Sequence, residues 1–229
     1  MSSYLTLVNL LLTRMNEVPL DILGDGFEST RGVHTLAKTA INNSIRQIYQ
    51  IAQEWPFLKT TFTQTLSPGT REYSYPTDYS SSDTDTFYLK KSVSFNNQPR
   101  YMPVIGYEEY TQSHRASDDS GRVGVPERVY QTYNNAFGVS PTPDEAYEVE
   151  YVYWSVPNDL LVYTDACLIP SRFNHIIIDG AMMYMMQFRA NDQAAAVNQQ
   201  NFDNGIKTMR RILLDDIQHV RGTVINRRH

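Results

Sequence analysis

The chain has 229 residues, of which 41% are hydrophobic and 20% charged. This composition excludes a chain that is disordered throughout and suits one or two folded domains. The formal net charge is −5, and the last twenty residues contain five Arg against two Asp, so the remainder carries −8. An acidic body argues against a broad nucleic-acid-binding face, which needs clustered cations.

The single cysteine, Cys167, excludes an internal disulfide, and its apolar neighbours predict a buried, unreactive thiol. The apolar run at residues 5–12 lacks the positive charge and cleavage site of a signal peptide. No stretch approaches the ~18 apolar residues of a membrane span. We therefore expect no membrane contact and assembly in the cytoplasm.

Residues 1–57 predict two helices. The first has apolar residues at three- and four-residue steps from Leu5 to Met15 and should end before Pro19. The second has an apolar stripe from Val33 to Trp55, and Pro56 should end it.

Residues 58–157 have the character of β-structure. Twelve of the sixteen tyrosines lie here, and apolar residues alternate at 87–95 and 147–153. Turn signals between these runs predict an antiparallel β domain, a barrel or a sandwich, of about six to eight short strands. We expect mobile loops at 79–85 and 113–124, and a helical turn at 107–110.

Residues 158–229 are again helical. The segment from Arg172 to Ala190 is apolar on most faces, which predicts a helix buried on several sides. Asn191 is a candidate cap for a second helix, whose pattern fades at Arg221. The simplest way to bury these stripes packs both chain ends together. We therefore predict an α+β fold in which residues 1–57 and 158–229 form a four-helix bundle and 58–157 form an inserted β domain.

Catalytic and metal-binding signatures are absent from the sequence, which predicts a protein that is not an enzyme and has no cofactor. Asp83 and Asp85 lack the glycine and distal glutamate of a calcium loop, so a solvated loop is favoured. Glu148 and Glu150 suit a solvent-facing row better than an acid–base pair. Met182, Met183 and Met186 favour an adaptable core or an interface.

The C-terminal tail leaves two alternatives open. It is either a frayed terminus or a peptide that orders on a partner, with apolar anchors between arginines. The residues concerned are Arg221, Val224, Ile225, Arg227 and Arg228.

Three stretches resemble the head-to-tail adaptor (connector) proteins of tailed bacteriophages, the group that includes tail tubular protein A. They are the run Glu54-Trp55-Pro56-Phe57-Leu58 after the second helix, the strand-and-turn segment 67–79, and the segment 139–157 with its Pro-Thr-Pro-Asp turn. The order of segments agrees over nearly the whole chain.

The resemblance implies a virion protein of the phage neck, a homo-oligomeric ring of twelve copies that joins the portal protein to the tail nozzle or tail tube. Genomic DNA would pass through without specific binding. The C-terminal tail would contact the portal, and Met182, Met183 and Met186 a neighbouring subunit. The β domain would face the tail through its loops, at Tyr79, Asp83, Asp85, His114 and Asp118.

Two alternatives remain. A virion adhesion or carbohydrate-binding module would use the Tyr-rich β domain through a shallow aromatic site. An enzyme would need converging titratable groups with shifted pKa values in a pocket, of which the sequence gives no sign.

Overall fold

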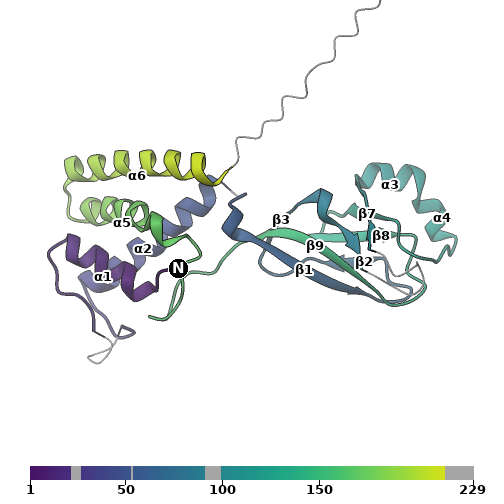
Figure 1. Ribbon diagram of the computed structural model, residues 1–229, viewed down its shortest axis with the longest axis horizontal. Coiled ribbons are helices and arrows are strands. Elements are labelled where there is room, and N and C mark those ends of the chain that lie inside the picture. Colours follow the sequence, from purple (N-terminus) through teal and green to yellow (C-terminus); the bar gives the residue numbers. More distant parts are fainter. Residues whose placement is uncertain (22–26, 53, 91–98, 215–229) are drawn as a thin grey trace, which may run out of the picture. The chain divides into compact units, whose positions relative to one another are not determined.

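The computed structural model describes residues 1–21, 27–52, 54–90 and 99–214. The chain folds as two compact units (Figure 1). One is formed by both ends of the chain, up to Ile51 and from Asp159 onward, and the other by Ala52–Asn158. In the described part of the chain, no helix combines the length and the hydrophobicity needed to cross a membrane.

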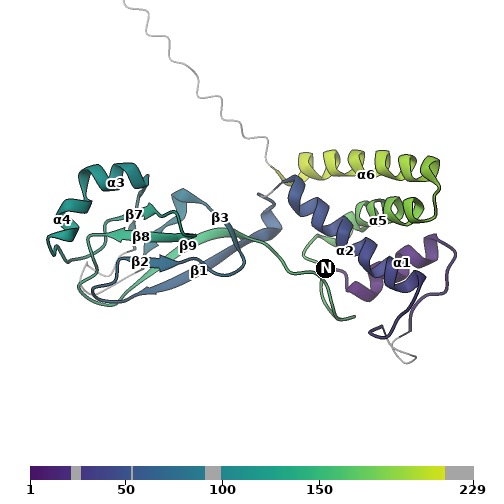
Figure 2. The same cartoon turned by 180° about the vertical axis from the view of Figure 1, so that it is seen from behind.

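In the helical unit, N-terminal helices pack with C-terminal helices, as predicted. The central helix, α5, contacts the other three, and α1 also contacts α2 (Figures 1 and 2). The helices are α1 (Tyr4–Arg14), α2 (Val33–Ile51), α5 (Asn174–Phe188, preceded by the 3-10 turn η4, Ser171–Phe173) and α6 (Asp192–Leu213).

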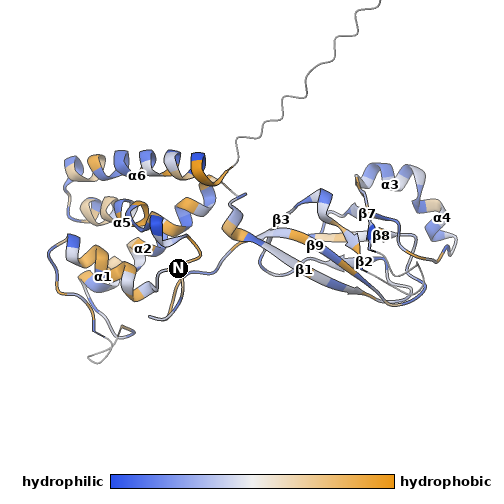
Figure 3. Cartoon of the chain, in the orientation of Figure 1, coloured by the Kyte–Doolittle hydropathy of each residue, from blue (hydrophilic) through white to orange (hydrophobic). Residues whose placement is uncertain are grey.

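The hydrophobic patterns explain this arrangement. Helix α5 buries residues on most of its circumference, including Ile176, Ile177 and Ile178, which confirms the prediction for this segment. Helix α6 buries one stripe only and is largely hydrophilic elsewhere (Figure 3). Its stripe consists of Ala195, Asn198, Phe202, Ile206 and Met209.

Local chemistry sets where helices begin and end. The Ser3 hydroxyl accepts a hydrogen bond from the Thr6 amide at the start of α1, and the predicted Asn191 cap accepts one from the Ala194 amide at 3.1 Å. The prediction that α2 continues to Trp55 is wrong. Trp55 is extended, with φ −60° and ψ 130°, because the following Pro56 disfavours helical geometry. Pro56 instead opens the 3-10 turn η1 (Pro56–Leu58).

The β unit contains two sheets. In the first, β9 (Tyr147–Ser155) pairs from Tyr147 to Trp154 with β1 (Lys59–Leu66), and its other edge pairs with β3 (Tyr79–Ser82) and β4 (Tyr88–Leu89). Strand β5 (Arg100–Tyr101) extends this sheet beyond β4. The second sheet has the order β2-β8-β7-β6, with bounds Glu72–Ser74, Ala136–Ser140, Arg128–Gln131 and Val104–Ile105.

Both sheets contribute to one buried cluster. Strand β9 shows the predicted alternation, because every second residue from Tyr147 to Ser155 is buried. Its inward side chains meet those of the second sheet, among them Phe137, whose ring lies 5.5 Å from that of Tyr151. The shared core consists of Leu66, Tyr73, Tyr75, Phe87, Leu89, Met102, Val129, Phe137, Val139, Tyr147, Val149, Tyr151 and Tyr153.

Three expectations for this segment need correction. Strand β6 pairs with β7 in parallel, so the unit is not purely antiparallel. The expected loop at 79–85 contains β3 and the 3-10 turn η2 (Thr84–Thr86), because the edge of β9 offers hydrogen-bond partners there. The expected loop at 113–124 contains α4 (Arg115–Asp119), which follows α3 (Tyr107–Ser113).

Candidate assembly surfaces

Among the described residues, no group of ionisable side chains converges as a metal site would require. No three His, Cys, Asp or Glu side chains in that part of the chain are placed to hold a metal ion. Burial raises the pKa of core tyrosines, to about 12 for Tyr153 and well above its usual range for Tyr151. These groups stay neutral and serve packing. The candidates for a functional role are therefore exposed surfaces that could contact other proteins.

Cys167 is buried, as predicted, with 1% of its surface exposed. Burial raises the pKa of its thiol, which keeps it protonated and unreactive. Its amide donates to the carbonyl of Ser2 at 2.9 Å. Cys167 therefore helps to hold the N-terminus in the helical unit.

Tyr79, Asp83 and Asp85, predicted to lie in a tail-facing loop, occupy an ordered edge of the first sheet. The Tyr79 ring stacks on Tyr75 with centroids 3.8 Å apart, and Asp83 pairs with Lys59 at 3.2 Å. Asp85 is exposed in η2. Only Asp85 of these three presents its side chain freely.

His114 lies at the junction of α3 and α4, and Asp118 lies within α4. His114 is partly exposed, and its carbonyl accepts from the Asp118 amide at 3.1 Å. The Asp118 side chain is only 4% exposed, so the expectation that it faces outward from a loop is wrong. The short helix α4 turns this side chain inward.

The methionines predicted to contact a neighbouring subunit lie on α5. Met182 and Met183 are 8% and 5% exposed, since α5 is covered by the surrounding helices. Met186 is partly exposed, and the neighbouring Phe188 is 65% exposed. A contact with a second copy stays a prediction, and Met186 is its accessible part. The predicted portal-contact residues Arg221, Val224, Ile225, Arg227 and Arg228 lie outside the described residues.

A short segment before α5 exposes two apolar side chains. Leu161 is 73% exposed and Val162 39%. We call residues 159–165 the Leu161 loop. Contiguous exposed apolar groups are a feature of surfaces that contact other proteins, and Leu161 and Val162 are adjacent.

The backbone of the Leu161 loop is fixed from both ends. The Asp165 carboxylate accepts from the amides of Leu161 and Val162 at 2.7 and 2.8 Å, and these bonds hold its pKa below the usual range. On α2, the Asn42 side chain donates to the Leu160 carbonyl at 2.9 Å and accepts from its amide, and Arg46 pairs with Asp159 at 2.6 Å. The loop is thus ordered before any partner arrives, which lowers the entropy lost on binding.

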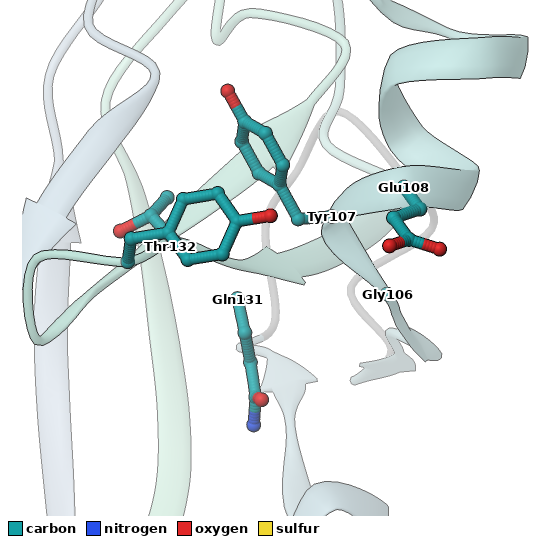
Figure 4. A pocket seen from close by; sticks show the side chains of 6 residues that line it. Gly106, Tyr107, Glu108, Gln131 and Thr132 are labelled. Atoms are coloured by element: carbon teal, nitrogen blue, oxygen red, sulfur yellow. The ribbon is translucent and has the colours of Figure 1, made fainter.

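The β unit carries a pocket of about 350 Å³ between the start of α3 and the end of β7 (Figure 4). Tyr107 and Glu108 line it from α3, while Gln131 and Thr132 line it from the strand side. Tyr133 completes the wall and is 80% exposed, with its ring centroid 4.9 Å from that of Tyr107.

Residues 2–227 match the family model described as SU10 adaptor protein. The chain belongs to the SU10 adaptor protein family, a family of phage head–tail adaptors. A search of curated proteins found no match. The match covers both units of the chain, which agrees with the resemblance noted in the sequence.

Adaptor family membership indicates a structural protein that binds other virion proteins. Sequence reasoning missed both the Leu161 loop and the pocket beside α3. The pocket had a readable signal, since Tyr107 and Tyr110 are spaced by three residues, as are Tyr130 and Tyr133. The Leu161 loop had no comparable local signal, since Asn42 and Arg46 of α2 hold it from far away in the sequence.

Proposed function

We propose that the chain forms a ring of twelve copies in the phage neck, which joins the portal protein to the tail nozzle or tail tube. The observation that carries this proposal is the family match over residues 2–227 of a chain built as a helical unit with an inserted β unit. Two units allow one part to bind neighbours and the head while the other meets the tail. On this proposal the two units are the two domains of the protein, and the helical unit is a four-helix bundle.

The helical unit is the proposed site of ring closure and of portal binding. A cyclic ring needs two different, complementary patches on each subunit. The Leu161 loop offers one preordered apolar patch, and the exposed Phe188 at the end of α5 offers a second apolar contact point. The C-terminal tail, with Val224 and Ile225 between arginines, would extend onto the portal and act there as an anchoring peptide.

The β unit is the proposed tail-facing part, with Asp85 and His114 among its accessible residues. It contains fourteen Asp and Glu against eight Lys and Arg, a net charge of −6. An acidic wall repels phosphate groups, which suits a conduit that DNA passes without specific binding.

Negative-stain imaging of the full chain, alone and mixed with candidate portal rings, tests this proposal. Added density in a ring on one face of the portal supports it. Deletion of residues 223–229 should abolish docking while the circular dichroism spectrum of the chain stays unchanged. Docking that persists in the truncated chain contradicts the role of the tail, and absence of docking by the full chain contradicts the portal contact.

A further inference from the structure

The pocket beside α3 is the outer end of a group of four tyrosines whose rings contact one another. Tyr110 and Tyr130 are 3% and 1% exposed and stack face to face with centroids 3.7 Å apart. Tyr107 contacts both of them, and Tyr133 contacts Tyr107 edge to face at an interplanar angle of 60°. The exposed ring of Tyr133 thus packs against Tyr107, which in turn contacts the buried pair Tyr110 and Tyr130.

Several contacts hold these tyrosines in place. Gly138 on β8 has no room for a β-carbon, because the Tyr130 ring lies against its backbone. The Arg71 guanidinium donates to the Tyr110 hydroxyl at 3.2 Å and pairs with Asp119 at 2.8 Å. The turn that carries Tyr133 is closed by the Thr132 amide and hydroxyl, which both donate to the carbonyl of Ala136.

The rim of the pocket is acidic. Glu108 lines it, Glu109 follows on the same exposed turn of α3, and neither forms an ion pair with any residue that the structure describes. The whole β unit is acidic as well, with a net charge of −6. An aromatic face beside a free carboxylate attracts a cation through both the ring quadrupole and the charge.

We propose that this pocket receives an arginine or lysine side chain from a partner protein. A guanidinium fits best, because it is planar, stacks on tyrosine and can reach the Glu108 carboxylate with its remaining donors. Phosphate groups are repelled by the same charge. Identification of the partner as the tail-side protein rests on the proposed function, whereas the chemistry of the pocket does not.

The test uses the full chain with its tyrosine rings labelled with ¹³C for NMR. N-acetyl-arginine-N-methylamide is the probe, its citrulline analogue is the neutral isostere, and tri-N-acetylglucosamine represents a carbohydrate. The arginine probe should shift the Tyr107 and Tyr133 ring signals saturably at low salt, and citrulline should act far more weakly. The Glu108→Gln and Tyr133→Ala variants should each weaken binding about 2- to 5-fold.

Asp85→Asn and Tyr101→Ala are matched controls, because both side chains are exposed in the same unit but do not line this pocket. Equal shifts with arginine and citrulline, shifts with the saccharide alone, or no shifts at all each overturn the proposal. A chain that binds arginine here but never joins a portal ring would contradict the proposed function and leave the pocket assignment standing.

Discussion

The hydroxyl oxygen of Ser44 on α2 occupies the space that a β-carbon on Gly180 of α5 would need. The same hydroxyl donates to the carbonyl of Ile177 at 2.9 Å. The same β-carbon would also lie 2.7 Å from the Phe202 ring of α6. One glycine therefore sets how closely the N-terminal and C-terminal helices pack.

Gly180→Ala should destabilise the helical unit by about 1–3 kcal/mol, since overpacking outweighs the gain of about 1 kcal/mol in helix propensity. Chemical denaturation followed by circular dichroism at 222 nm measures this. Gln187→Ala, at an exposed position of α5, is the control and should be nearly neutral. The double variant Ser44→Ala/Gly180→Ala should recover part of the loss, and strict additivity would refute the contact.

Gly138→Ala should destabilise the β unit by about 2–3 kcal/mol or more, because the buried Tyr130 ring must leave its stack with Tyr110. Gly124→Ala is the matched control, since its β-carbon would meet only Pro141 at an ordinary 3.7 Å. Near-ultraviolet circular dichroism, which reports tyrosine packing, follows the change. Equal stability of the two variants would be inconsistent with the close approach at Gly138.

The Leu161 loop should loosen in acid. The folded-state pKa of Asp165 is lowered, so the stability it contributes is present above its unfolded value of about 3.9 and is lost as pH falls through the folded value. Hydrogen exchange of the Leu161 and Val162 amides, corrected for intrinsic rates, should therefore lose protection below about pH 4. Asp165→Ala should show the same loss at pH 7. Protection that is independent of pH and of Asp165 would contradict this role.

Arg14 joins three helices of the helical unit. Its guanidinium donates to Asp179 on α5 at 2.5 Å and to Asn198 on α6 at 3.2 Å. Arg14→Ala should lower stability by about 1 kcal/mol, because it leaves the largely buried Asp179 and Asn198 without this donor. Arg189→Ala, which breaks a more exposed pair with Glu17, should change stability by less than about 0.5 kcal/mol. Equal losses in a urea titration would refute this ranking.

Much of the fold could be predicted from hydrophobic periodicity. The near-continuous apolar surface of α5 required a helix with neighbours on several sides, and the alternation in β9 required a sheet with one buried face. Pro56 marked the end of the helical segment but not the last helical residue, Ile51, because local backbone geometry sets helix ends within a few residues.

The candidate surfaces were harder to predict, since they depend on contacts distant in sequence. Asp118 looks like a loop residue, yet α4 turns it inward, and no local pattern reveals this. The Leu161 loop is held by Asn42, 118 residues away from Leu160. Met182 and Met183 suited an interface by composition, but packing around α5 uses them within the chain.

Mass photometry of portal rings, before and after addition of the full chain, tests the central claim most directly. The adaptor account predicts a single new species heavier by twelve copies of the 26.3 kDa chain. A portal mass that stays unchanged at saturating concentrations of the chain would contradict it.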